Sequence, residues 1–267
     1  MRFWCYHRYL PSQTLSRPVM LADLLASAQR IALDSSPATA AAASDATERE
    51  SGGAAGMAHA RLDQCRSTVQ CIRFSDLGLS GTLETLKLSF PGAQCVQFVD
   101  VLDHAALSVS LIIFPPGSSI PLHDHPGMHV FTKVLVGQLD IQMLDVDQPL
   151  PCAAIPVGTS VGVSHRRTVT LRAGEFCELT PVIGNIHGVA CTGHETAVML
   201  DVMLPPYPSD DACHYFKATD SGAQLCVINE ALAWGFDDAS VAPEASSAKK
   251  QGKKGKRKSG GGARGSS

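Results

Sequence analysis

The sequence predicts a mainly β protein, an antiparallel sandwich or barrel preceded by short N-terminal helices. From about Leu88, short segments rich in Val, Ile, Leu and Phe recur between Gly and Pro turns, as in antiparallel β domains. Upstream segments instead have apolar residues at helical spacing. The hydrophobic share is 45%. No apolar run reaches the ~18 residues needed to cross a bilayer, so we expect a soluble globular protein.

The helices and the strands can be assigned in chain order. Residues 19–33 predict a helix, because apolar side chains recur there at helical spacing. A second helix is expected at 59–72. Six later segments have the length and β-branched content of strands. These strands are expected at 95–102, 107–114, 129–136, 139–146, 167–172 and 196–204.

Composition divides the chain into a main domain and two flanking segments. The segment between the expected helices has too few apolar residues for a core, and the C-terminus is mostly Ser, Gly, Ala, Lys and Arg. We therefore expect a flexible N-terminus at 1–16, a main domain at 17–241 with a low-complexity insertion at 35–57, and a basic disordered tail at 242–267.

The charge distribution limits the kinds of partner that the protein can bind, and the cysteines indicate its cellular compartment. The last 19 residues hold eight Lys/Arg and no acid, which leaves 14 Lys/Arg against 25 Asp/Glu, a net charge of −11, in the rest. An acidic body argues against a nucleic-acid partner. The nine scattered cysteines lack a CxxC pair and predict reduced intracellular thiols. We expect a cytoplasmic monomer, with the basic run at 249–258 as a candidate nuclear address or a solubilising tail.

The segment "PLHDHPGMHV" at 121–130 is the first candidate for chemistry. His123 and His125 lie two apart, so they point to one face of an extended segment. About sixty residues later, "GNIH" contributes His187. A pair from one strand and a third histidine from a distant strand can form a metal site in a barrel mouth, since imidazoles bind Fe, Zn, Cu and Ni. The alternative for the pair alone is two satisfied surface or core histidines.

These motifs resemble one family closely. "PPGSSIPLHDHPGM", "GNIH" and "LDVMLPPY" together are similar to the plant cysteine oxidase and animal cysteamine (2-aminoethanethiol) dioxygenase family within the cupin superfamily. The likeness covers roughly residues 17–240. It implies a cupin double-stranded β-helix (a jelly roll), in which His123, His125 and His187 bind Fe(II) and O2 converts a thiol to a sulfinic acid.

The residues that follow the histidine pair agree with this ligand set. Many cupins place a carboxylate ligand a few positions after HxH, but positions 128–130 are Met, His and Val. Three neutral imidazoles leave the full charge on the metal, which lowers the pKa of a nearby thiol. His129 shares strand parity with the pair. Because Pro126 and Gly127 should break that parity, we expect a histidine of the pocket wall rather than a fourth ligand.

Two further residues are candidates for catalytic roles. Asp201 stands alone in the apolar run "AVMLDVML", and a buried carboxylate needs a partner. The resemblance favours a group that holds a ligand histidine or a substrate amine; the alternative is a sheet-edge or turn residue. Tyr207 matches the tyrosine of the family's PPY motif. It is expected either to pack at a strand end or to lie near the substrate thiol or O2.

Other polar residues receive structural interpretations. Cys213 and Tyr215 are two apart on one strand face, and we favour two core residues over a covalent Cys–Tyr link. Asp124 alternates away from the histidines and is expected to cap a turn. No chemistry is assigned to three histidines near loop-like segments, His165, His194 and His214.

The function expected from the sequence is a non-haem Fe(II) thiol dioxygenase that uses O2 to convert the N-terminal cysteine of proteins to cysteine sulfinic acid. This reaction would write an oxygen-dependent N-degron. The first alternative is a cysteamine dioxygenase that produces hypotaurine. The others are a Zn or Mn cupin of non-redox function and a cupin that only binds a metal or ligand. In every case we expect neither a nucleic-acid nor a membrane partner.

Overall fold

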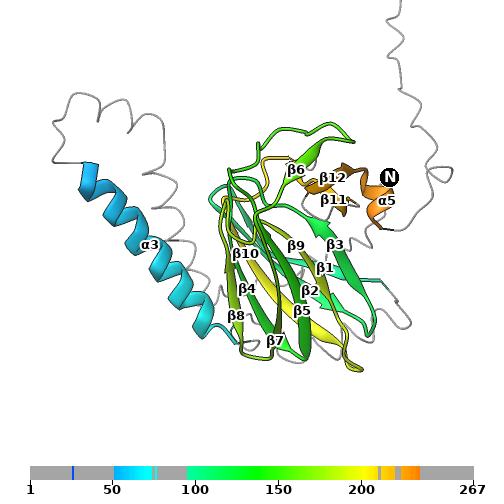
Figure 1. The fold of residues 1–267 in the computed structure, drawn as a ribbon. Coiled ribbons are helices and arrows are strands. Elements are labelled where there is room, and N and C mark those ends of the chain that lie inside the picture. Colours follow the sequence, from blue (N-terminus) through cyan, green and yellow to red (C-terminus); the bar gives the residue numbers. More distant parts are fainter. Residues whose placement is uncertain are drawn as a thin grey trace, which may run out of the picture.

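The computed structural model describes residue 26 and residues 51–73, 76, 95–209, 212–219 and 224–234. Two antiparallel sheets face each other and form the expected double-stranded β-helix (Figure 1). The five-stranded sheet contains, in spatial order, β1 (Gln97–His104), β2 (Leu107–Phe114), β10 (Ala197–Leu204), β4 (His129–Val136) and β8 (Phe176–Leu179). The seven-stranded sheet contains, in spatial order, β6 (Ser160–Gly162), β12 (Gln224–Ile228), β11 (Tyr215–Ala218), β3 (Ser119–His123), β9 (Ile186–Ala190), β5 (Gln138–Asp145) and β7 (His165–Arg172).

The predicted fold class and all six predicted strands are confirmed, each strand with bounds within two residues of the expected ones. The other six strands are three to five residues long. Segments this short carry too little periodicity to be assigned from sequence. They matter for the site all the same, because β3 and β9 are among them.

The core between the sheets is built by alternating side chains. Met199 of β10 and Ile112 of β2 pack against Ile120 and Val189 of the opposite sheet. On β4, Val130 belongs to this same cluster. Successive strand residues point to opposite faces, so the residues that alternate with Met199, Ile112 and Val130 point to the other face of the five-stranded sheet.

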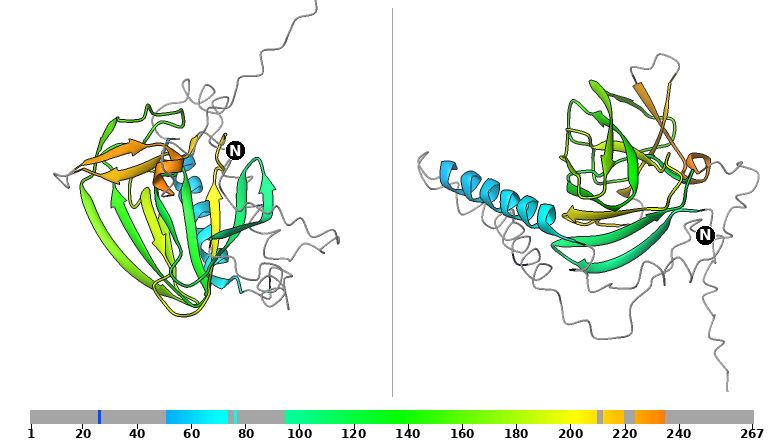
Figure 2. Two further views of the ribbon diagram at one scale, coloured as in Figure 1. Left: turned by 90° about the vertical axis from the view of Figure 1, so that its right-hand side faces the viewer. Right: turned by 90° about the horizontal axis from the view of Figure 1, so that it is seen from below.

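That outer side is covered by the helix α3 (Ser51–Cys71), whose C-terminal part lies against the sheet (Figures 1 and 2). Cys65, Val69 and Ile72 pack with Leu200 and Val202 of β10 in one buried cluster. With apolar partners on both faces, β10 is buried along almost its whole length. This explains why its sequence reads as a continuous apolar run around a single aspartate.

Polar contacts also attach the helix to the sheet. Arg66 of α3 donates to both carboxylate oxygens of Glu178 on β8, at 2.7 and 3.1 Å. The ammonium of Lys133 on β4 donates to the carbonyl of Gln70. A bidentate Arg–carboxylate pair fixes orientation as well as distance. The register of α3 on β4 and β8 is therefore defined by charge as well as by packing.

The N-terminal helices differ in part from the expectation. The helix predicted at 59–72 is present but begins at Ser51, so residues 51–57 of the expected insertion are helical. Three of these seven residues are glycines, which are poor helix formers, so the composition of the segment did not predict the extension. Of the helix expected at 19–33, only residue 26 is described, and it is helical. The expected flexible N-terminus, the rest of the insertion and the basic tail lie outside the described residues.

A short helix, α5 (Glu230–Ala233), follows β12 and is capped by the Asn229 side chain, which accepts from the Leu232 amide. Within the described part of the chain, neither helix is long and apolar enough to cross a lipid bilayer.

Candidate metal centre

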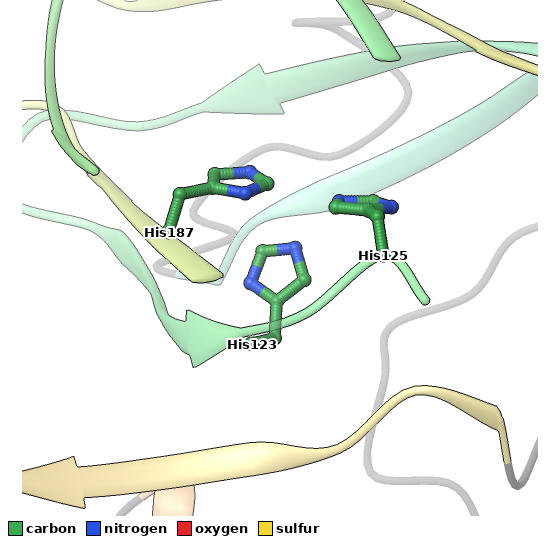
Figure 3. A group of neighbouring side chains, drawn as sticks. All are labelled: His123, His125 and His187. Atoms are coloured by element: carbon green, nitrogen blue, oxygen red, sulfur yellow. The ribbon is translucent and has the colours of Figure 1, made fainter. Parts of the chain in front are cut away.

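The structure brings the three sequence-predicted histidines together, with their rings turned toward one another (Figure 3). His123 ends β3 and lies opposite His187 of β9 in the ladder between these strands. His125 lies two residues beyond β3, in the connection to β4. One ring nitrogen from each histidine lies within 4.8 Å of the other two. The ring centroids are 4.4 to 5.1 Å apart.

The backbone that carries His125 is held by its local sequence. The Met128 amide donates to the His125 carbonyl at 3.1 Å and closes a turn. Gly127 in this turn has φ 69°, a conformation that favours glycine. The Asn185 side chain donates to the same carbonyl at 2.8 Å. Asn185 precedes His187 by two residues, so the "GNIH" segment supplies one histidine and supports another.

Burial keeps the three imidazoles in the neutral form. It lowers the pKa of His123, and it lowers the pKa values of His125 and His187 further, because neighbouring histidines add repulsion to the desolvation. Neutral imidazole is the form that binds a metal. Protonated histidines could not share so small a volume without strong repulsion.

The hydrogen bonds leave nitrogen lone pairs directed at the shared volume. His123 Nδ1 donates to the Pro121 carbonyl at 2.9 Å, which leaves Nε2 as the lone-pair nitrogen. Among the described residues, His125 Nε2 and His187 Nδ1 have no hydrogen-bond partner although both are buried. Buried polar atoms without partners are costly, and a cation would satisfy them. The residues therefore fit a metal ion held by three nitrogen donors.

Tyr207, for which the sequence left packing and substrate contact open, contacts a ligand histidine. Its hydroxyl lies 2.5 Å from the Asp124 carbonyl and 2.8 Å from His125 Nδ1. The hydroxyl has one proton, and the carbonyl can only accept, so Tyr207 donates to Asp124 and accepts from His125 Nδ1–H. This tautomer leaves Nε2 free for a metal. Burial also raises the pKa of Tyr207, which keeps its hydroxyl protonated.

Asp201 lies on β10, in the sheet opposite the histidines, and is buried. Among the described residues, its hydrogen-bond donor is the Thr132 hydroxyl at 2.6 Å, not a ligand histidine. Burial, only partly offset by that bond, raises the pKa of Asp201 to about 6. A carboxyl group with a raised pKa beside a candidate metal site is a feature of functional sites.

A cavity of about 480 Å³ joins these groups. Its wall includes the three histidines, Asp201 and Tyr207. Three more acids line it, Asp100, Asp103 and Glu230, and none of its described lining residues is Lys or Arg. The size is that of pockets that enclose small-molecule ligands. The acidic wall favours a ligand with positive charge.

His129 is not part of this cavity, so the expected pocket-wall position is wrong. The turn at Gly127 does break the strand parity, as expected, and β4 then starts with His129 on its outer face. Its Nδ1 lies 3.5 Å from the Glu178 carboxylate, which also binds Arg66 of α3. On the same strand, Thr132 points inward to Asp201. His129 thus belongs to the contact between the sheet and α3.

The structure also changes the interpretation of Asp124 and His214. Asp124 is fully buried, and its carboxylate accepts from the backbone N–H of His214 at 2.7 Å and from the ring Nδ1–H at 2.8 Å. Sequence reasoning assigned a turn cap to the first residue and no chemistry to the second. Cys213 and Tyr215 both line the cavity, and burial raises the pKa of the Cys213 thiol to about 12.

The fold and the site together define a class: a double-stranded β-helix with three buried histidines at its mouth, suited to a metal ion. The chain belongs to the PCO_ADO family, whose sequence model matches residues 68–245. The family predicted from the histidine motifs is therefore confirmed.

Two curated relatives and one solved structure illustrate the similarity. The chain is 30% identical to 2-aminoethanethiol dioxygenase of Homo sapiens over 178 residues, 60% of this chain and 66% of that protein. It is 26% identical to plant cysteine oxidase 1 of Arabidopsis thaliana over 164 residues, 58% of this chain and 54% of that protein. A protein with a double-stranded β-helix domain from Klebsiella pneumoniae is 18% identical, with a TM-score of 0.33, and the match covers 45% of this chain and 85% of that chain. The match thus spans less than two thirds of each of these two curated relatives.

Proposed function

We propose that this protein is an Fe(II)-dependent thiol dioxygenase that oxidises the N-terminal cysteine of proteins to cysteine sulfinic acid. The observation that carries the proposal is the set of three buried, neutral histidines, with no carboxylate in the group, beside an acidic cavity. The family membership and the names of both relatives support the same reaction class.

The reaction is balanced without an external reductant. A thiol and O2 give a sulfinic acid, RSH + O2 → RSO2H, so both oxygen atoms enter the product and sulfur supplies the electrons. Bound Fe(II) supplies the redox chemistry that joins O2 to sulfur. His123, His125 and His187 would hold it on one side and leave the side toward the cavity for substrate. A cation at this position also favours the thiolate form of the substrate.

The protein groups around the site suit an amine next to the thiol. An N-terminal cysteine carries its ammonium two carbons from sulfur. We assign recognition of that ammonium to Asp201, which lines the same cavity as the histidines. Tyr207 holds His125 in the tautomer that directs Nε2 to the metal. In this assignment Asp201 acts on the substrate, and Tyr207 acts through a ligand.

The size of the cavity favours a peptide. At about 480 Å³, it exceeds the space needed for cysteamine, a molecule of only a few heavy atoms. The first residues of a peptide chain would fill the remainder. Cysteamine is the second candidate, because the first curated relative is named for it, and it has the same spacing of amine and thiol.

One assay compares these possibilities. The iron-loaded protein is incubated aerobically with a Cys-starting peptide, its N-acetylated form, a peptide with an internal Cys, and cysteamine, and products are examined by mass spectrometry. We expect two added oxygens on the first peptide and far less on the others. Equal rates for free and acetylated peptides would remove the role of the amine. Oxidation of cysteamine alone would assign the small thiol as substrate.

Metal and gas controls address the non-redox alternatives. A Zn or Mn cupin, or a protein that only binds a ligand, would consume no O2 with thiol. Anaerobic incubation and the zinc-loaded protein should therefore abolish product formation. Activity of the zinc form equal to that of the iron form would refute the proposal.

In the cell, this reaction would create N-degrons on proteins with an N-terminal cysteine only when O2 is present. The scattered spacing of the cysteines and the lack of a CxxC pair in the sequence support a reducing compartment such as the cytoplasm or nucleus. The corresponding test is whether a reporter with an N-terminal Cys becomes long-lived in hypoxia only when this protein is present.

A further inference from the structure

Asp124 stands between two ligand histidines and is held from several directions. Its amide donates to the His214 carbonyl at 3.2 Å, and its carboxylate accepts the His214 amide at 2.7 Å. The second carboxylate oxygen lies 2.8 Å from His214 Nδ1, and its carbonyl accepts from Tyr207. The Asp124 and His214 side chains are 0% and 4% exposed, so these bonds do not compete with water.

The bonding pattern fixes the His214 tautomer and extends the contact to the cavity wall. The Asp124 carboxylate can only accept, so Nδ1 of His214 carries the hydrogen. Nε2 is then an acceptor, and the amide of Ile155 donates to it at 3.0 Å. The Ala153 carbonyl lies 3.2 Å from the same nitrogen. Ala154 and Ile155 line the cavity, so one imidazole contacts both the ligand segment and the cavity wall.

We propose that Asp124 and His214 form a positioning pair that sets the affinity of the three-histidine site for its metal and fixes the cavity wall at Ile155. Among the described residues, both donors to the Asp124 carboxylate come from His214, and any rotation of the Asp124 backbone moves His123 and His125 together. The pair can therefore set the orientation of both ligand histidines through the backbone of Asp124. The metal part of this inference needs the three-histidine site but not the proposed thiol substrate.

Two substitutions at one position separate the two contacts. In His214→Asn, the amide nitrogen stands near the place of Nδ1 and keeps a donor for Asp124, but the side chain is too short to reach Ile155. In His214→Gln, the terminal amide reaches toward Ile155, but the side-chain donor to Asp124 is lost and only the backbone N–H at this position still donates to the carboxylate. His165→Asn is the matched control, because His165 is exposed at the start of β7. Asp124→Asn is a third variant that weakens the pair from the other side.

The measurement is a Co(II) titration of the metal-free full chain, followed by the visible absorption of the bound ion, with no thiol or O2. We expect His214→Gln and Asp124→Asn to raise the Kd for Co(II) roughly 10- to 100-fold, the range for groups that orient metal ligands. His214→Asn and the control should keep the wild-type Kd. In the peptide oxidation assay, which rests on the proposed function, His214→Asn should raise KM and leave kcat unchanged.

Two results would refute the proposal that Asp124 and His214 position the metal ligands. One is a folded His214→Gln variant, checked by far-UV circular dichroism, that binds Co(II) like wild type. The other is failure of all three pair variants to fold, since the pair would then serve stability alone. Failure of the wild type to bind Co(II) would refute the metal site and this inference with it. A protein that binds Co(II) but oxidises no thiol would refute the proposed function and leave the affinity result to decide on the pair.

Discussion

Replacing Asp201 by Asn should stabilise the metal-free protein at neutral pH while it lowers activity. Asp201 is buried and its pKa is raised from 3.8 to about 6. Between these values the folded protein holds a proton that the unfolded chain has released, so stability falls as the pH rises through this window. A separation of about two pKa units corresponds to about 3 kcal/mol above pH 6. Asn has no such charge to bury, and its side-chain oxygen can still accept from Thr132.

The assay is urea unfolding of chelator-treated wild type and Asp201→Asn at several pH values between 4 and 8. The two proteins should be equally stable near the acid end, and the variant should gain up to about 3 kcal/mol by pH 7. Asp103→Asn is the control, because Asp103 is exposed at the cavity mouth. A difference that does not change with pH, or a less stable variant, would refute the reasoning.

The same variant tests the catalytic assignment. With iron bound, Asp201→Asn should retain most of the metal, because among the described residues Asp201 accepts from Thr132 and not from a ligand histidine, yet it should lower turnover at least ~10-fold. A carboxylate that costs stability and is needed for turnover is an instance of the trade-off between stability and activity. Wild-type turnover in the Asn variant would make Asp201 a structural residue.

Three further predictions follow from the site and its surroundings. Ala at any of the three ligand histidines, for example His187→Ala, should remove most of the iron measured by metal analysis, whereas His129→Ala should retain it. Gly184→Ala should destabilise the protein by about 1–3 kcal/mol in thermal unfolding, because Gly184 has φ 65° and an added Cβ would lie 2.7 Å from Met143 Cε. Burial raises the pKa of Glu178, but the hydrogen bonds and positive charge of Arg66, together with the His129 ring 3.5 Å away, outweigh it and bring the pKa to about 2. The stabilisation from this carboxylate is therefore lost as the pH falls from about 4.5. Glu178→Gln should therefore make stability depend less on pH at the acid end; an unchanged dependence would count against the ion pair of Glu178 with Arg66.

The parts of the site that the sequence predicted are those governed by local rules. His123 and His125 lie two residues apart on extended backbone, so their common direction follows from strand geometry. His187 was identified by its glycine-flanked motif. The structure confirms that the three meet, because β3 and β9 pair directly. The predicted strands were likewise those long enough to show a pattern.

The parts that the sequence did not predict depend on contacts between distant segments. His214 is 90 residues from Asp124, and Thr132 is 69 residues from Asp201. No local pattern selects these partners. His129 was misplaced for a related reason: the face on which a strand begins depends on how many residues the preceding turn uses. One residue more or fewer in that turn reverses the face of every side chain that follows.

The two halves of the site belong to different sheets. His123 and His187 lie on strands of the seven-stranded sheet, and Asp201 lies on a strand of the five-stranded sheet. Facing sheets are separated by about 10 Å, a spacing set by the side chains packed between them. The histidines and Asp201 project into that gap from opposite sides, so a substrate with its sulfur at the metal and its amine at Asp201 would only have to bridge the short distance left between them. The bulk of interior residues such as Met199 and Ile112 therefore limits the length of substrate that fits, although neither residue carries a functional group for the reaction.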